Sequence, residues 1–156
     1  MALIHEKLYQ SESLAKIDLA EYVQSLTSYL FLSYGVSERV IKPKISIENV
    51  TLNIDRMIPC ALIINELVSN SLKHAFPDSW RRAGGTGEIR IDLRQDTGHK
   101  CQLTVSDNGV GLPRGLKMKN CESLGLKLVS VLVKQLKGVI QINQRRGSEF
   151  VVTFDA

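Results

Sequence analysis

The chain has 156 residues, of which 44% are hydrophobic and 23% are charged, and its formal net charge is +4. This composition fits one globular domain with a buried core, and it excludes a disordered chain and a fibrous repeat. A membrane span is not expected, because no apolar run approaches the roughly 18 residues that such a helix needs, and the first residues lack the apolar core of a signal peptide.

The first expected element is a helix over residues 18–34, where apolar side chains recur at helical spacing. Asp18 is its expected N-cap, because a short polar side chain can accept from the free amides of the first turn, and Gly35 is its expected stop. Residues 1–12 are also compatible with a helix, but that segment is too short to be stable alone.

Strand structure is expected next, over residues 44–55, where apolar and polar side chains alternate as in one or two strands. Pro59 is then expected to open a long helix that ends before Pro77, because proline is favoured in the first turn of a helix. Residues 77–87 are rich in glycine, and we expect them to form a loop.

The second half of the chain consists mainly of expected strands. The pattern predicts strands over 88–94 and 101–106, an irregular glycine-bearing segment over 107–123, a mostly buried helix over 124–136, and closing strands over 139–143 and 149–154. This tally predicts an α+β fold, a two-layer α/β sandwich with a mixed, mostly antiparallel sheet and helices on one face.

The predicted helix from Pro59 to Phe76 has two faces when its residues are placed about 100° apart. The apolar face holds Ala61, Ile64, Val68, Leu72 and Ala75, and the polar face holds Glu66, Asn70, Lys73 and His74. A face that is simply solvated is the ordinary explanation of the polar residues. Asn70 is the exception, because asparagine is a mediocre helix former, and its amide oxygen is a candidate ligand for a cation.

A carboxylate stands at the end of the strand expected from residue 101. Asp107 has the same parity as the apolar residues of that strand, so its side chain should point toward the core. A buried carboxylate needs a hydrogen-bond donor, and the exocyclic amine of a bound base could supply one. Gly109 and Gly111 follow, where a backbone turns tightly or approaches a ligand. An ordinary Asp-Asn-Gly turn explains the same residues equally well.

Residues 123–127, Ser-Leu-Gly-Leu-Lys, open the next expected helix. Its free amides and the positive end of its dipole could receive phosphate oxygens. A simple N-cap is the competing explanation. The rest of this helix is apolar around most of its circumference, so only its first turn is a candidate for binding.

Charge and cysteine content narrow the class of protein only slightly. A positive charge suits an anionic ligand such as a nucleotide, but it equally suits nucleic acid or a solvated surface. The cysteines Cys60, Cys101 and Cys121 are widely spaced and lack the pattern of a zinc site. We therefore expect buried thiols in a reducing, cytoplasmic compartment.

Several of these segments together resemble a known family. Residues 65–74, 107–111 and 123–126 resemble, in this order, the N, G1 and G2 boxes of the GHKL ATPase superfamily. Residues 147–150, Gly-Ser-Glu-Phe, resemble the closing Gly-Thr-x-Phe of sensor histidine kinase catalytic domains. The Asn-Glu-Leu of the N box is similar to one kinase subgroup that includes many light and stress sensors. Residues 2–10 resemble the end of that subgroup's second dimerisation helix.

The resemblance implies a nucleotide, ATP with Mg²⁺, between the N-box helix and a flexible lid over residues 112–123. Asn70 would coordinate Mg²⁺, and Lys73 and His74 would touch phosphate or ribose oxygens. Asp107 would accept from the adenine amine, and Ser148, in the place of the family's threonine, would hold a water that base and carboxylate share.

Further roles follow from the same resemblance. Gly109 and Gly111 would let the backbone pass the base, while Gly125 and Leu126 would cradle the phosphates. Glu66 is expected to position the shell of the metal or to polarise the acceptor, because a kinase must keep water from the γ-phosphate.

The resemblance also implies partners and a domain division. We expect a remnant of the dimerisation helix over residues 1–15 and the catalytic domain over residues 16–156. The phosphoacceptor histidine would lie on a helix absent from this chain, because His5, His74 and His99 do not stand in its usual context. The parent kinase is expected to be a homodimer that acts with a response regulator and not with nucleic acid.

Three alternatives to a histidine kinase remain open. An anti-sigma-factor serine kinase shares the boxes, but the helical remnant at the start argues against it. A hydrolytic ATPase of the gyrase or chaperone kind would need a transducer domain. A degenerate module would bind a partner without catalysis, although Asn70, Asp107 and the glycines are all present.

Overall fold

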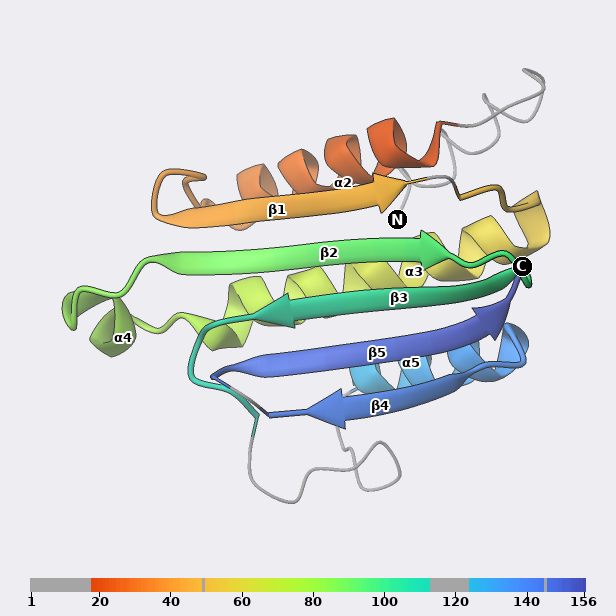
Figure 1. Cartoon of the computed structure of the whole chain (residues 1–156). Helices are drawn as coiled ribbons and strands as arrows, with labels where there is room; N and C mark the ends of the chain where they lie inside the picture. The colour runs from red at the N-terminus through yellow and green to blue at the C-terminus, as the bar shows by residue number, and fades with distance from the viewer. Residues whose placement is uncertain (1–17, 49, 113–123, 145) are drawn as a thin grey trace.

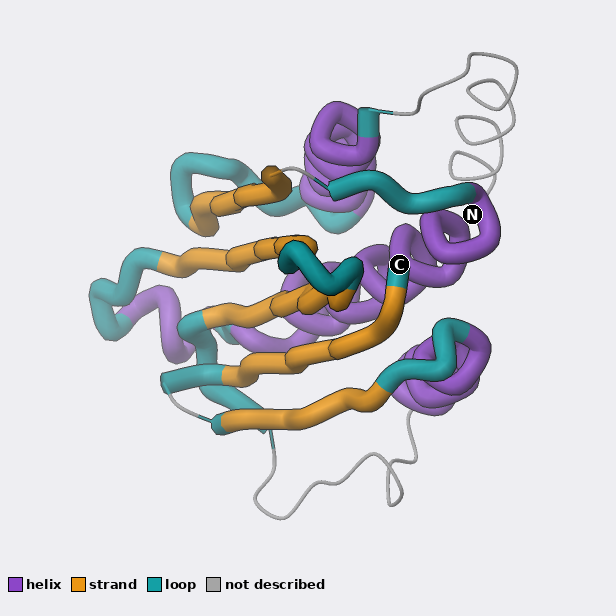
Figure 2. The backbone as a smooth tube through the Cα atoms, turned by 45° about the vertical axis from the view of Figure 1, so that its right-hand side comes forward, coloured by secondary structure: helices purple, strands orange, loops and turns teal. Residues whose placement is uncertain are grey.

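The computed structural model of the chain describes residues 18–48, 50–112, 124–144 and 146–156. In this part of the chain, five strands form one sheet in the order β1-β2-β3-β5-β4, and the long helices pack on one face of it (Figure 1). The view in Figure 2 separates the strand layer from the helix layer. The predicted α+β two-layer sandwich is confirmed.

Helices and strands are interspersed along the chain, and β2 leads directly into β3 as β4 leads into β5. They are α2 (Leu19–Ser33), β1 (Ile41–Glu48), α3 (Ile54–Asn70), the π-helical turn η1 (Ser71–Ala75), α4 (Asp78–Arg82), β2 (Gly87–Gln95), β3 (Lys100–Asp107), α5 (Leu124–Gln135), β4 (Val139–Asn143) and β5 (Ser148–Asp155). Among the described strands, β1 and β2 pair in parallel and the other neighbours are antiparallel, so the predicted mixed sheet is also confirmed.

The ends of α2 follow the sequence signals. The Asp18 carboxylate accepts a hydrogen bond from the amide of Glu21 at 3.2 Å. Gly35, with φ +64°, donates to the Leu32 carbonyl, and the next amide donates to the Phe31 carbonyl, which satisfies the free carbonyls of the last turn. The predicted cap and stop are confirmed.

The start of α3 differs from the prediction. Residues 50–55 do not continue a strand, because α3 begins at Ile54 and the side chain of Asn53 caps it by accepting from the Arg56 amide at 3.2 Å. Pro59 therefore lies inside the helix and does not open it. The apolar face predicted for this helix is nevertheless buried in full: Ala61, Ile64, Val68, Leu72 and Ala75.

The predicted loop over 77–87 contains a short helix, α4. Pro77 precedes its first residue in an extended conformation, and the Trp80 ring packs edge-on against Phe76 with the ring centroids 5.1 Å apart. Aromatic packing against the end of η1 thus orders a segment that glycine content alone assigns to a loop.

The core lies between the sheet and the helix layer. Cys60 on α3 and Cys101 on β3 are fully buried there, as predicted for these thiols, whereas Cys121 lies outside the described residues. Within the described ranges, no helix is both long and apolar enough to cross a bilayer.

Candidate functional site

The helix that carries the polar stripe does not end as a regular α-helix. After Asn70 the backbone widens into the π-helical turn η1, which the prediction of one continuous helix to Phe76 missed. The turn is held from outside, because the Val110 amide donates to the Ala75 carbonyl at 2.9 Å. The glycine segment after β3 therefore docks onto the end of this helix. Such π-helical turns often mark functional sites.

The polar stripe becomes more exposed along the helix. Glu66 and Asn70 are half-buried and lie one turn apart on α3, whereas Lys73 and His74 on η1 are exposed. The Lys73 ammonium lies 5.6 Å from the centroid of the Tyr34 ring, at the end of α2. The four predicted polar residues thus lie on α3 and η1 with their side chains at least partly exposed, and we call this set the N-box edge.

The polar residues on this edge could bind a magnesium ion only if water and substrate supply most of its ligands. Among the described residues, no group of three or more histidine, cysteine, aspartate or glutamate side chains could hold a metal. Magnesium, however, usually takes one or two protein oxygens and completes its shell with water and substrate phosphates. The half-buried amide of Asn70, with Glu66 one turn away, is compatible with that kind of site.

Asp107 is buried, as its parity predicts, and it has protein donors on both oxygens. Its Oδ2 accepts from Ser71 Oγ at 2.7 Å and from Ser148 Oγ at 2.8 Å. Its Oδ1 accepts from the Gly109 amide at 3.0 Å. These contacts join η1, the end of β3 and the start of β5 at one point, and they satisfy a carboxylate that is only 7% exposed.

Ser71 is the member of this cluster that sequence reasoning missed. Its hydroxyl reaches Asp107 from a turn that lies 36 residues earlier in the chain. The sequence signal that could have indicated Ser71 is its position next to Asn70, as a polar residue beside the apolar face of the helix. Ser148, in contrast, follows from strand pairing, since it lies directly opposite Asp107 in the register of β3 and β5.

The glycines of this region are required by close packing. A Cβ atom on Gly109 would overlap the Ala75 carbonyl oxygen, and one on Gly147 would overlap the Asp107 carbonyl oxygen. Gly111 and Gly147 also adopt φ values of +81° and +114°, which favour glycine. These contacts account for Gly109 and Gly111 without a ligand, so the predicted passage of the base stays a prediction.

The last predicted residues lie at the start of α5. Gly125 is half-buried and Leu126 is buried in the first turn of this helix. Most of the predicted lid, residues 113–123, lies outside the described residues.

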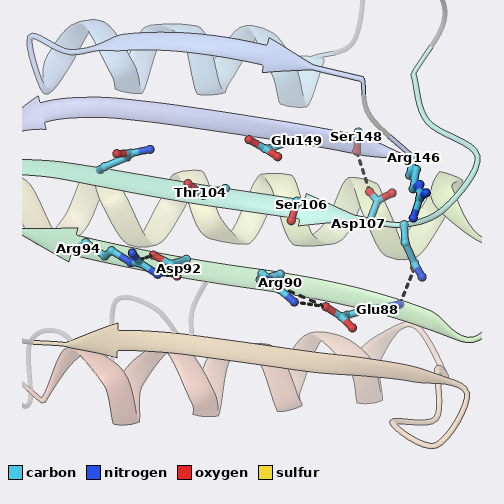
Figure 3. A pocket seen from close by; sticks show the side chains of 12 residues that line it. Glu88, Arg90, Asp92, Arg94, Thr104, Ser106, Asp107, Arg146, Ser148 and Glu149 are labelled. Carbon is cyan, nitrogen blue, oxygen red and sulfur yellow. Dashed lines mark hydrogen bonds and ion pairs between the residues drawn. The ribbon is translucent and has the colours of Figure 1, made fainter.

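A cavity of about 600 Å³ lies on the open face of the sheet, opposite the helices (Figure 3). Of the predicted site residues, only Asp107 and Ser148 line it, at one end, and Asn70, Lys73 and Gly125 do not. All of its lining residues are polar or charged. Ligand pockets are usually lined mostly by apolar side chains, so we centre the candidate site on Asp107 and the N-box edge and not on the middle of this cavity.

The chain matches a known family over the same elements. Residues 57–156, from α3 to the end of β5, match the family described as histidine kinase-, DNA gyrase B-, and HSP90-like ATPase. The chain belongs to this ATPase family. Residues 1–34, which include α2, match a second family described as histidine kinase.

Individual relatives of this ATPase domain are sensor kinases. The chain is 27% identical over 155 residues to the sensor histidine kinase PdtaS of Mycobacterium tuberculosis, a match that covers 97% of this chain and 30% of the relative. It is 29% identical over 115 residues to the blue-light-activated histidine kinase 2 of Erythrobacter litoralis, covering 74% of this chain and 32% of the relative. The chain thus spans about a third of the length of these curated relatives.

Solved structures support the fold of the ATPase domain. The histidine kinase domain of the EL346 blue-light activated histidine kinase from Erythrobacter litoralis superposes with a TM-score of 0.82. That similarity covers 97% of this chain and 71% of the other, at 22% sequence identity.

Proposed function

We propose that this chain is the Mg-ATP-binding catalytic domain of a two-component sensor histidine kinase, which transfers the γ-phosphoryl group to a histidine on a dimerisation helix. The observation that carries the proposal is Asp107, a buried carboxylate held at the end of β3 beside the N-box turn of an ATPase-family domain. The Asn-Glu-Leu subgroup of these kinases is part of the same proposal.

Each polar residue of the edge has a role in this proposal. Asp107 accepts from the adenine amine, and the exposed side chains of Lys73 and His74 would contact phosphate or ribose oxygens. Asn70, with Glu66 one turn earlier on α3, would hold Mg²⁺. A bound Mg²⁺ would neutralise charge on the phosphates during transfer. The first turn of α5, with Gly125 and Leu126, would direct its backbone amides toward the phosphates.

The acceptor and the partners belong to the proposal as well. We place the acceptor histidine on a helix outside this chain, although His5 lies within the segment that matches the histidine kinase family. The parent is proposed to be a homodimer that signals to a response regulator, with its catalytic domain at residues 16–156. The free, buried thiols of Cys60 and Cys101 support a reducing, cytoplasmic compartment.

Calorimetric titration of the chain with ATP, with and without Mg²⁺, tests the nucleotide site. We expect Mg²⁺ to strengthen binding and Asp107→Asn to weaken it by tenfold or more, because the amide can donate as well as accept and would disturb the cluster. Asp92→Asn, on the open face of the same sheet, is the matched control and should bind as the wild type does. A wild type that binds no ATP would instead favour a partner-binding module without catalysis.

Radiolabelled ATP tests the placement of the acceptor. With Mg-ATP, the chain alone should acquire no acid-labile, alkali-stable phosphate, whereas a separately supplied dimerisation helix from the parent should. Phosphohistidine on the isolated chain that disappears in His5→Ala would place the acceptor on this chain and overturn that part of the proposal.

A further inference from the structure

The Asp107 carboxylate has little capacity left for hydrogen bonds from a base. A carboxylate offers about four lone-pair positions. The hydroxyls of Ser71 and Ser148 both occupy Oδ2, at 2.7 and 2.8 Å, and the Gly109 amide occupies one position on Oδ1 at 3.0 Å. Donors from the described residues therefore leave about one acceptor position, and it is on Oδ1.

This remaining capacity distinguishes between purine bases. Adenine presents one exocyclic amine beside a ring nitrogen that only accepts, so a single acceptor position on the carboxylate serves it. Guanine presents its ring N1–H and its exocyclic amine side by side, and this pair of donors fits the two oxygens of one carboxylate. With Oδ2 filled, one of the two guanine donors would be buried without a partner, which costs affinity.

We propose that Ser71 is a specificity-determining residue that makes this site select adenine over guanine nucleotides by filling Oδ2 of Asp107. The inference rests on the proposed function, because it assumes that the base binds at Asp107. It adds a reason why the carboxylate would not pair with guanine, although a carboxylate with both oxygens open is suited to do so.

The position of Ser71 makes this role specific to it. Ser71 is only 7% exposed and is the first residue of η1, so its hydroxyl is delivered by the π-helical turn. Ser148 is set opposite Asp107 by the sheet register and fills only one of the two positions on Oδ2. An alanine at 71 would keep the Cβ atom but would leave the other position open to a second base donor.

The test measures the affinities of Mg-ATP and Mg-GTP for the complete chain, by displacement of a fluorescent ATP analogue. We expect the wild type to prefer ATP by at least about thirtyfold, and Ser71→Ala to reduce this preference by about tenfold, the usual effect of one unpaired buried donor. The control is Ser69→Ala, which removes a buried serine two residues earlier. That residue points about 200° away around the helix, so its loss should leave the preference unchanged.

Inosine triphosphate sharpens the test because it keeps the N1–H of guanine but lacks the exocyclic amine. It needs only one acceptor position, so the wild type should bind it about tenfold more tightly than GTP, and Ser71→Ala should remove this difference. A loss of affinity for ATP, GTP and inosine triphosphate by the same factor in Ser71→Ala would show a merely structural role and overturn the inference. A wild type that binds none of the three nucleotides would overturn the proposed function together with the inference.

Discussion

The two faces of the central sheet treat charge in opposite ways. The helix-facing side carries Asp107, which is buried and receives hydrogen bonds from Ser71 on η1 and Ser148 on β5. The open face carries Glu88 and Asp92, which pair with Arg90 and Arg94 at 2.9 and 3.0 Å while the arginine side chains stay 58% and 77% exposed. A buried carboxylate must be fixed by its partners, whereas an exposed pair is free to exchange them for water. Fixed geometry is what recognition requires, so the difference favours the inner face as the site.

The largest predicted difference between the faces concerns thiol reactivity. In a Cys121→Ser variant, Cys60 and Cys101 should react with a disulfide reagent at least about a thousandfold more slowly in the folded chain than in urea, because reaction requires opening of the core. Adding Gln102→Cys places a thiol on the open face of β3, next to Cys101, and this thiol should react at once. Rapid modification of both core thiols in the native state would show that the inner face is accessible.

The same core predicts a loss of stability in alkali. Burial, with a smaller contribution from nearby Cys101, raises the pKa of Cys60 from its ordinary value of 9.0 to about 12. Between these two values the Cys60 thiol keeps its proton in the folded state and loses it in the unfolded state. The contribution of Cys60 to the free energy of unfolding is therefore complete below pH 9 and is lost as the pH rises toward 12. In urea unfolding, the free energy of unfolding should fall between pH 8 and pH 11. This decrease should be smaller in Cys60→Ala.

Gly109→Ala is predicted to give the next largest effect. Its new Cβ would overlap the Ala75 carbonyl oxygen, which also accepts from Val110, so η1 and the glycine segment would have to separate. We expect a loss of about 2 kcal/mol in the free energy of unfolding, as for overpacked sites. Gly98→Ala, in the exposed β2–β3 turn, is the matched control, since its Cβ would lie 3.4 Å from the nearest side chain. Equal stability of the two variants would refute the close packing at the site.

Tyr22→Phe should stabilise the chain. The Tyr22 hydroxyl on α2 is buried and has no hydrogen-bond partner among the described residues, and burial raises its pKa from 10.0 to about 12. Removing an unsatisfied buried hydroxyl should raise the free energy of unfolding by about 1 kcal/mol. Tyr29→Phe, on the same helix but 46% exposed, should change nothing. Destabilisation by Tyr22→Phe would mean that a bound water satisfies this hydroxyl.

Periodicity predicted the parts of the site that a single element determines. The alternation along β3 was enough to predict that Asp107 is buried. The spacing along α3 was enough to predict which residues face the core and which lie on the edge with Asn70. Both are properties of one regular strand or helix, which a local pattern can specify.

Contacts between distant elements were beyond that reasoning. The hydrogen bond from Ser71 to Asp107 depends on η1, a change of helical pitch that no local pattern marks. The start of α3 was missed because residues 50–54 alternate like a strand, and the capping Asn53 was overlooked in favour of Pro59. Where two local patterns compete, the hydrogen bond of the cap and the packing of the helix on the sheet decide the outcome.

The smallest predicted effect on stability comes from the ion pairs on the open face of the sheet. Arg94→Ala removes an exposed ion pair with Asp92 and should change the free energy of unfolding by less than about 0.5 kcal/mol.

Arg56→Ala is the matched change in the helix layer, where the guanidinium donates to the Leu136 carbonyl at 2.8 Å and links α3 to the end of α5. It should cost about 1 kcal/mol, because a partly buried carbonyl loses its charged donor. If urea unfolding gave Arg94→Ala the larger loss, charge on the open face would be as firmly held as charge on the inner face. Firmly held charge would then no longer distinguish the helix-facing side, where Asp107 lies, from the open face.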